Sequence, residues 1–142
     1  MRTPEQVKWD FVQQWIGKAQ KDLRAGEILL RGEDLGDYDS VGFHAQQAAE
    51  KFMKAVLVRH QVEFPKTHDV ALIRRLIAQI DQSLSARLAS GDILTPYAVD
   101  FRYPGDSPVL TKDGGIQALQ LARQVADIVL DHLKPYLDAG RP

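Results

Sequence analysis

The chain has 142 residues, 44% hydrophobic and 26% charged, so it can bury a core, and no apolar run approaches the roughly 20 residues that cross a bilayer. The absence of cysteine excludes disulfide scaffolds, zinc-thiolate sites and cysteine nucleophiles, and it agrees with the reducing cytoplasm, where we expect the protein. The net charge of −1 argues against strong nonspecific attraction to nucleic acid or to anionic membrane.

A long first helix is predicted to begin at Thr3, which can act as its N-cap, with Pro4 in the first turn. Its apolar face recurs at steps of three and four and consists of Val12, Ile16, Ala19, Leu23, Gly26 and Leu30. Gly32 and Gly36 are expected to end this helix. A second helix is predicted from about residue 39 to about His60.

The second half of the chain also has helical spacing. Residues 67–69 form a turn and a fresh cap for a third helix, which begins at Val70. Residues 82–101 favour helix, although Gly91 and Pro96 predict a break or kink. A loop follows, and Thr111 or Asp113 can cap the last helix, whose core face is Ile116, Leu119, Ala122, Val125, Val129, Leu133 and Tyr136. Because no stretch alternates as a strand would, we expect an all-α fold, an antiparallel up-and-down bundle of four to five helices in one domain, 1–142.

The second helix has the most informative pattern. One continuous apolar arc consists of Val41, Ala45, Ala48, Ala49, Phe52, Met53, Ala55 and Val56. A polar stripe runs beside the arc over about 15 Å, the scale of a nucleotide, and consists of His44, Gln47, Lys51 and Lys54. Residues 51–75 carry six Lys/Arg and two Asp/Glu, a net of +4. This charge is either a solvated surface or a place where a phosphate binds.

Phe43, Glu50 and Leu57 form a third line on the far side of the same helix. Apolar residues on two sides of a helix indicate contact with another helix of the bundle or with a second copy of the chain. We therefore expect a homodimer. The four-residue spacing from Glu50 to Lys54 also permits an ion pair, as on many helices without a binding function.

Three segments in order resemble the HEPN family, the higher eukaryotes and prokaryotes nucleotide-binding domain. They are HAQQAAEKFMKAVL at 44–57, KTHDV at 66–70 and FRYP at 101–104. The resemblance covers residues 18–135 and implies a helical, commonly dimeric bundle. It also implies a minimal nucleotidyltransferase as a possible partner, in a toxin–antitoxin-like pair, and a nucleotide or RNA as a possible ligand.

Some members of the family are metal-independent ribonucleases, which use an arginine followed four to six residues later by a histidine. In that chemistry histidine moves protons while arginine stabilises charge on the phosphate. No arginine of this chain has a histidine at that separation. The resemblance therefore leaves the catalytic residues unknown and makes a ribonuclease the less favoured alternative.

The family motifs predict a phosphate-binding cleft in which His44, Lys51, His68 and Arg102 converge, with Tyr103 as a stacking residue or as a target of nucleotide transfer. The alternative is a structural network in which His68 helps to cap the third helix and Arg102 ties the loop to the bundle. The four histidines lack metal-ligand spacing, so we expect no metal and no cofactor. Three functions stay open: a binding module, a divergent endoribonuclease and a purely structural interaction protein.

Overall fold

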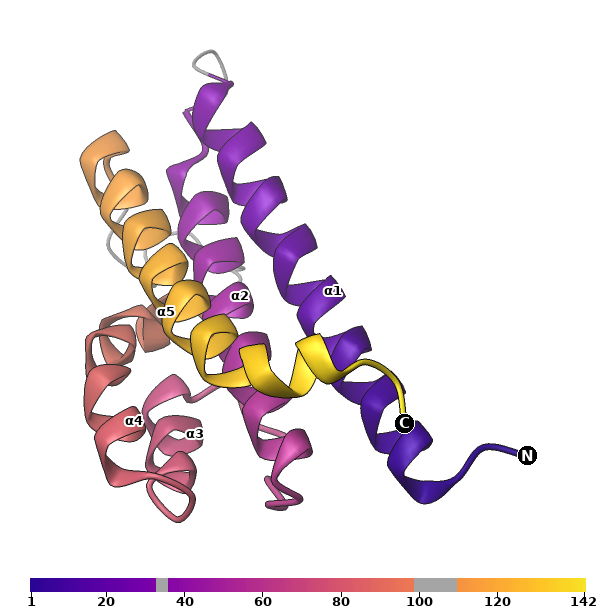
Figure 1. The fold of residues 1–142 in the computed structure, drawn as a ribbon. Coiled ribbons are helices and arrows are strands. Elements are labelled where there is room, and N and C mark those ends of the chain that lie inside the picture. The colour runs from indigo at the N-terminus through magenta and orange to yellow at the C-terminus, as the bar shows by residue number, and fades with distance from the viewer. Residues whose placement is uncertain (33–35, 99–109) are drawn as a thin grey trace.

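The computed structural model describes residues 1–32, 36–98 and 110–142, and within these ranges it contains helices and no strand (Figure 1). The helices are α1 (Pro4–Arg31), α2 (Tyr38–Arg59), α3 (Val70–Ile77), α4 (Gln82–Arg87), the 3-10 helix η1 (Ala89–Ala98) and α5 (Lys112–Ala139). The expectation of an all-α bundle is confirmed. Over the same ranges, none of the helices combines the length and the apolar character that a bilayer crossing requires.

Capping residues identified in the sequence mark several helix starts. Thr3 and Gln6 form a capping box, in which the Gln6 backbone N–H donates to Thr3 Oγ1 at 3.1 Å and the Thr3 N–H donates to Gln6 Oε1 at 3.0 Å. Asp69 caps α3, and Thr111 caps α5. The start of α2 lies slightly earlier than expected because Asp37 accepts from the backbone N–H of Ser40.

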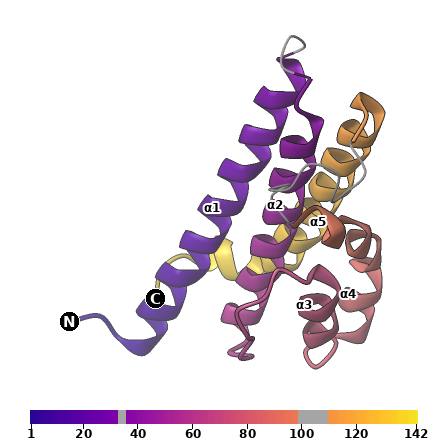
Figure 2. The ribbon, with the colours of Figure 1, turned by 180° about the vertical axis from the view of Figure 1, so that it is seen from behind.

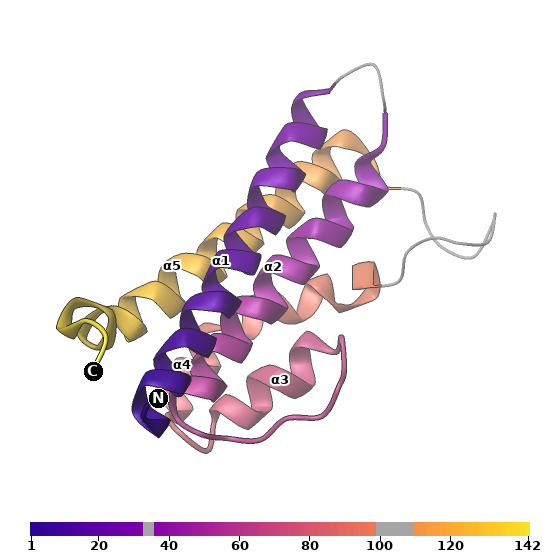
Figure 3. The ribbon, with the colours of Figure 1, turned by 90° about the vertical axis from the view of Figure 1, so that its right-hand side faces the viewer.

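The three long helices do not all alternate in direction. α1 and α2 are antiparallel neighbours, whereas α5 runs beside α2 in the same direction (Figures 1 and 3). α3, α4 and η1 intervene between α2 and α5 in the chain, and η1 brings Tyr97 beside Gly42, near the start of α2. There the Leu110 N–H donates to Asp39 Oδ1 at 2.7 Å, which ties the start of α5 to the start of α2. α3 and α4 lie on the side of α2 away from α1 (Figure 2).

Helix α2 is the centre of the bundle. All eight residues of its predicted apolar arc are buried, and so are Leu57 and Glu50 from the far-side line. Leu57 therefore contacts the interior of its own chain, the first of the two alternatives. α1 and α5 come close at Gly26, where an added Cβ would lie 2.7 Å from Leu119 Cδ2. A small residue at this position allows the two helices to approach.

The break expected between residues 82 and 101 lies at Leu88 rather than at Gly91 or Pro96. The six-residue helix α4 ends there, and the chain continues as the 3-10 helix η1, which contains both of those residues. Gly91 is buried, and an added Cβ would lie 3.2 Å from Met53 Cε and 3.1 Å from Val125 Cγ2. The absence of a side chain at Gly91 therefore allows η1 to lie close to α2 and α5.

Candidate functional site

Two residues of the predicted polar stripe, His44 and Lys51, face helix α1. Lys51 Nζ donates to Asp22 Oδ2 at 2.5 Å, and His44 Nδ1 lies 2.9 Å from Asp22 Oδ1. Burial alone raises the pKa of Asp22, but the hydrogen bonds and charges of His44 and Lys51 lower that pKa below its ordinary value. We call these three residues the Asp22 cluster. Its carboxylate is ionised at neutral pH and holds both predicted ligand residues.

The other two residues of the stripe, Gln47 and Lys54, contact Glu50, whose side chain is only 2% exposed. Lys54 Nζ donates to Glu50 Oε1 at 2.5 Å. Gln46 Nε2 donates to Glu50 Oε2 at 3.0 Å, and Gln47 Nε2 donates to the same oxygen at 3.4 Å. The pair of Glu50 and Lys54 is thus buried rather than on an exposed helix surface.

Lys54 is enclosed by apolar and aromatic groups as well as by its carboxylate partner. Its Nζ lies 5.4 Å from the centre of the Trp15 ring and 5.5 Å from that of Phe64. A further contact joins Nζ to the Thr67 carbonyl oxygen at 3.3 Å. The Lys54 ammonium therefore makes its contacts with groups inside the chain, so Lys54 has an internal structural role.

His68 combines an exposed ring with a buried anchor. Its side chain is 65% exposed, while Nδ1 lies 3.0 Å from Glu50 Oε2. The His68 carbonyl also accepts from Gln46 Nε2 at 2.8 Å, which fixes the backbone. Because a carboxylate only accepts, Nδ1 is the donor in this contact, which leaves Nε2 on the exposed edge of the ring. We call Gln46, Gln47, Glu50, Lys54 and His68 the Glu50 cluster.

The described contacts therefore divide the predicted site residues into two groups. His44 and Lys51 share Asp22, whereas Gln47, Lys54 and His68 share Glu50. Arg102 and Tyr103, the last two predicted ligand residues, lie outside the described residues. Asp69, rather than His68, supplies the side-chain cap of α3. The ligand-binding role of the seven residues stays a prediction.

A pair of histidines was not visible in the sequence. His60, at the end of α2, and His132, in α5, approach each other with their Nε2 atoms 3.0 Å apart. Burial is the main cause of a lowered pKa for both rings, and the neighbouring His132 and Arg59 lower the pKa of His60 further. Their 72-residue separation has no local spacing that a motif search could recognise.

We expect the free energy of unfolding to fall as the pH drops below about 6.5, the ordinary histidine pKa. Both folded-state pKa values are lowered, so the unfolded chain binds more protons than the folded chain as the pH drops below that value. Their stabilisation is present above 6.5 and is lost on acidification. Urea denaturation at pH 7.5 and at pH 5.5, in the presence of a metal chelator, measures this free energy. Between the two pH values, the free energy of unfolding should decrease less in a His60→Gln/His132→Gln double variant than in the wild type. Equal decreases would contradict this assignment.

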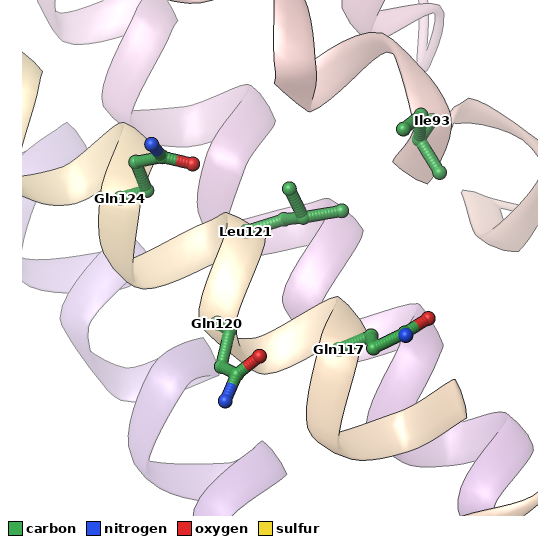
Figure 4. Close-up of a pocket in the computed structure, with 5 residues that line it drawn as sticks. All are labelled: Ile93, Gln117, Gln120, Leu121 and Gln124. Carbon is green, nitrogen blue, oxygen red and sulfur yellow. The ribbon is translucent and has the colours of Figure 1, made fainter. Parts of the chain in front are cut away.

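A groove of about 520 Å³ lies elsewhere, between α5 and η1 (Figure 4). It is lined by Ile93, Gln117, Gln120, Leu121 and Gln124. The lining has no titratable side chain and none of the seven predicted residues, so we do not place acid–base chemistry there. Within the described ranges, no group of three or more His, Cys, Asp or Glu side chains could hold a metal ion.

The fold is a helical bundle of a known class. Residues 12–133 match the HEPN domain family model, so the chain belongs to the HEPN domain family, as its motifs predicted. A relative from Methanocaldococcus jannaschii, named "Putative toxin MJ1304", is 27% identical in an alignment 138 positions long, and the match covers 87% of this chain and 89% of the relative.

Two solved structures share the fold. One is ST0689, an archaeal HEPN homologue, with a TM-score of 0.67 and 21% identity over 86% of this chain and 97% of that one. The other is TT1696 from Thermus thermophilus, with a TM-score of 0.66 and 26% identity over 84% of this chain and 96% of that one. The chain thus has a HEPN fold over most of its length.

Proposed function

We propose that this protein is a dimeric, cytoplasmic HEPN module of a toxin–antitoxin-like pair, which binds a phosphate group of a nucleotide or RNA at His68. Its partner in this proposal is a minimal nucleotidyltransferase. Family membership and the toxin-named relative support the general context. The observation that supports the site is the exposed His68 ring, held from behind by the buried carboxylate of Glu50.

The free energy needed to bury the charges of Glu50 and Lys54 favours a functional explanation for the Glu50 cluster. Burying two charges costs several kcal/mol per ion before their attraction compensates, and apolar replacements of such pairs are often equally stable. Stability alone is therefore a weak reason for placing Glu50 and Lys54 in the interior. The solvent-exposed member of the cluster is His68, so we infer that the network serves to orient this imidazole.

The surroundings of His68 favour an anionic ligand. Three of the six cations in residues 51–75 are paired inside the chain: Lys51 with Asp22, Lys54 with Glu50, and Arg74 with Asp92. Lys66, two residues before His68, is exposed and can contribute its charge to a ligand there. A protonated His68 would donate from Nε2 to a phosphate oxygen, and the Glu50 carboxylate would stabilise the imidazolium.

Calorimetric titration with ATP and with a short RNA tests this site. We expect His68→Ala to weaken binding at least about tenfold, since a hydrogen bond to a charged group contributes about 1.5–3 kcal/mol. Lys66→Ala should weaken binding less. His132→Ala, a histidine outside both clusters, is the matched control and should bind like the wild type. No heat with either ligand, or equal affinity after His68→Ala, would remove the proposal.

A divergent endoribonuclease is the second candidate, because a carboxylate-oriented histidine can act as a general acid or base. Incubation with structured RNA compares the wild type with His68→Ala and with Glu50→Gln, which loses the orienting charge. Cleavage by the wild type and slower cleavage by both variants would support the enzyme. RNA left uncut by every protein excludes it. If binding is also absent while sedimentation shows a dimer, the structural interaction protein remains.

A further inference from the structure

We propose that His60 and His132 form a two-imidazole site for a late first-row divalent metal ion, which would join the end of α2 to α5. The Nε2 atoms of the two rings lie 3.0 Å apart, and the ring centroids lie 5.2 Å apart. The two residues come from helices that run side by side in the same direction (Figure 1). This site is separate from the Glu50 cluster and does not depend on the function proposed above.

The distance between the nitrogens is close to that of a chelating pair. Zinc–nitrogen bonds of about 2.0–2.1 Å at a tetrahedral angle place two ligand nitrogens roughly 3.3 Å apart. The two rings face each other almost head-on, so each must tilt by roughly 35° before both lone pairs point at one ion that replaces the shared hydrogen. His60 is the C-cap residue of α2, where the backbone can accommodate such a tilt.

Imidazole binds a metal in its neutral form, and burial lowers the pKa of both rings. Charged side chains of both signs surround the pair. Asp81 and Asp131 favour a cation, while Arg59, Arg87 and Lys8 oppose one.

Two of these opposing cations have partners of their own. Arg59 is stacked 4.2 Å from the Tyr136 ring, and Lys8 Nζ lies 2.8 Å from Glu5 Oε2. Glu5 offsets part of the Lys8 charge, whereas Arg59 and Arg87 still oppose a cation at the pair. Water would complete the coordination.

Two nitrogen ligands select the class of ion. Imidazole suits Zn²⁺, Cu²⁺ and Ni²⁺, whereas Mg²⁺ and Ca²⁺ prefer oxygen ligands. A bound ion would connect two helices that are far apart in the sequence. Since the unfolded chain does not hold the two rings together, binding would stabilise the folded state.

Calorimetric titration of the full chain with Zn²⁺ at pH 7.5, with Mg²⁺ as a comparison, tests the site. We expect one Zn²⁺ per chain, no Mg²⁺ binding, and at least about tenfold weaker Zn²⁺ binding in His60→Gln and in His132→Gln. Glutamine can still hydrogen-bond the remaining ring but is a poor zinc ligand. His44→Gln and His68→Gln are matched controls and should bind Zn²⁺ like the wild type.

A second measurement distinguishes a loss of Zn²⁺ binding from misfolding of the variant. Zn²⁺ should raise the Tm of the wild type and of both control variants but not that of His132→Gln, while all four proteins show the same helical circular dichroism. Equal Zn²⁺ affinity in the wild type and His132→Gln would show adventitious surface binding and overturn the proposal. Absence of Zn²⁺ binding to the wild type would overturn it too, and would leave a neutral histidine–histidine hydrogen bond.

Discussion

Glu50→Ala is expected to lower the free energy of unfolding by about 3–5 kcal/mol, the usual result of removing one partner from a buried ion pair. Lys54 Nζ would keep the Thr67 carbonyl as an acceptor but would lose its charged partner in an environment lined by Trp15 and Phe64. Urea denaturation at pH 7, followed by tryptophan fluorescence, measures the change. A loss below about 1 kcal/mol would contradict the buried pair.

A double variant separates the charge from the space that it occupies. Glu50→Gln combined with Lys54→Met replaces both charges with groups of similar size, so we expect it to recover most of the stability lost in Glu50→Ala. Lys134→Met is the control, because Lys134 and Asp138 form an exposed pair with the same four-residue spacing. Its free energy of unfolding should stay close to that of the wild type.

The same double variant connects stability with function. It should be folded, yet His68 would lose the carboxylate that orients its ring. A folded protein with weakened phosphate binding would therefore support the positioning role of Glu50. Wild-type binding by this variant would show that His68 needs no charged anchor and would restrict the cluster to a structural role.

Local features of the sequence predicted the helices well. Capping depends on hydrogen bonds within one turn, so Thr3, Asp69 and Thr111 could be identified from the residues that follow them. The apolar arc of α2 was also predictable, since a 3.6-residue period determines which residues share a face. These signals predicted the class of fold and its central helix.

Contacts between distant residues could not be predicted in the same way. The polar stripe on α2 was recognised in the sequence. The division of its residues between the Asp22 cluster and the Glu50 cluster depends on where Asp22 of α1 and the turn at residues 66–69 lie in space. The spacing of the stripe gave no indication that Lys54 would be buried next to the rings of Trp15 and Phe64. The contact between His60 and His132 needs α5 to run beside α2 in the same direction, which no local spacing in the sequence indicates.

The central place of α2 leads to the second large effect. Phe52→Ala should lower the free energy of unfolding by about 3–5 kcal/mol, because Phe52 is fully buried and its loss leaves a cavity in close-packed surroundings. Phe11→Ala is a matched control, since the Phe11 side chain on α1 is 49% exposed and should contribute less than about 1 kcal/mol. Urea denaturation at pH 7 compares the two variants.

The ratio of the two effects tests the arrangement of the bundle. If α2 is enclosed by α1, α5 and η1, movement of one neighbour alone cannot fill the cavity left by Phe52→Ala. Phe52→Leu should recover much of the lost free energy of unfolding, because leucine fills part of that cavity. Similar costs for Phe52→Ala and Phe11→Ala would instead mean that α2 lies at the surface. In that case the buried anchor of His68 would also be absent, because Glu50 lies on the same helix within one turn of Phe52.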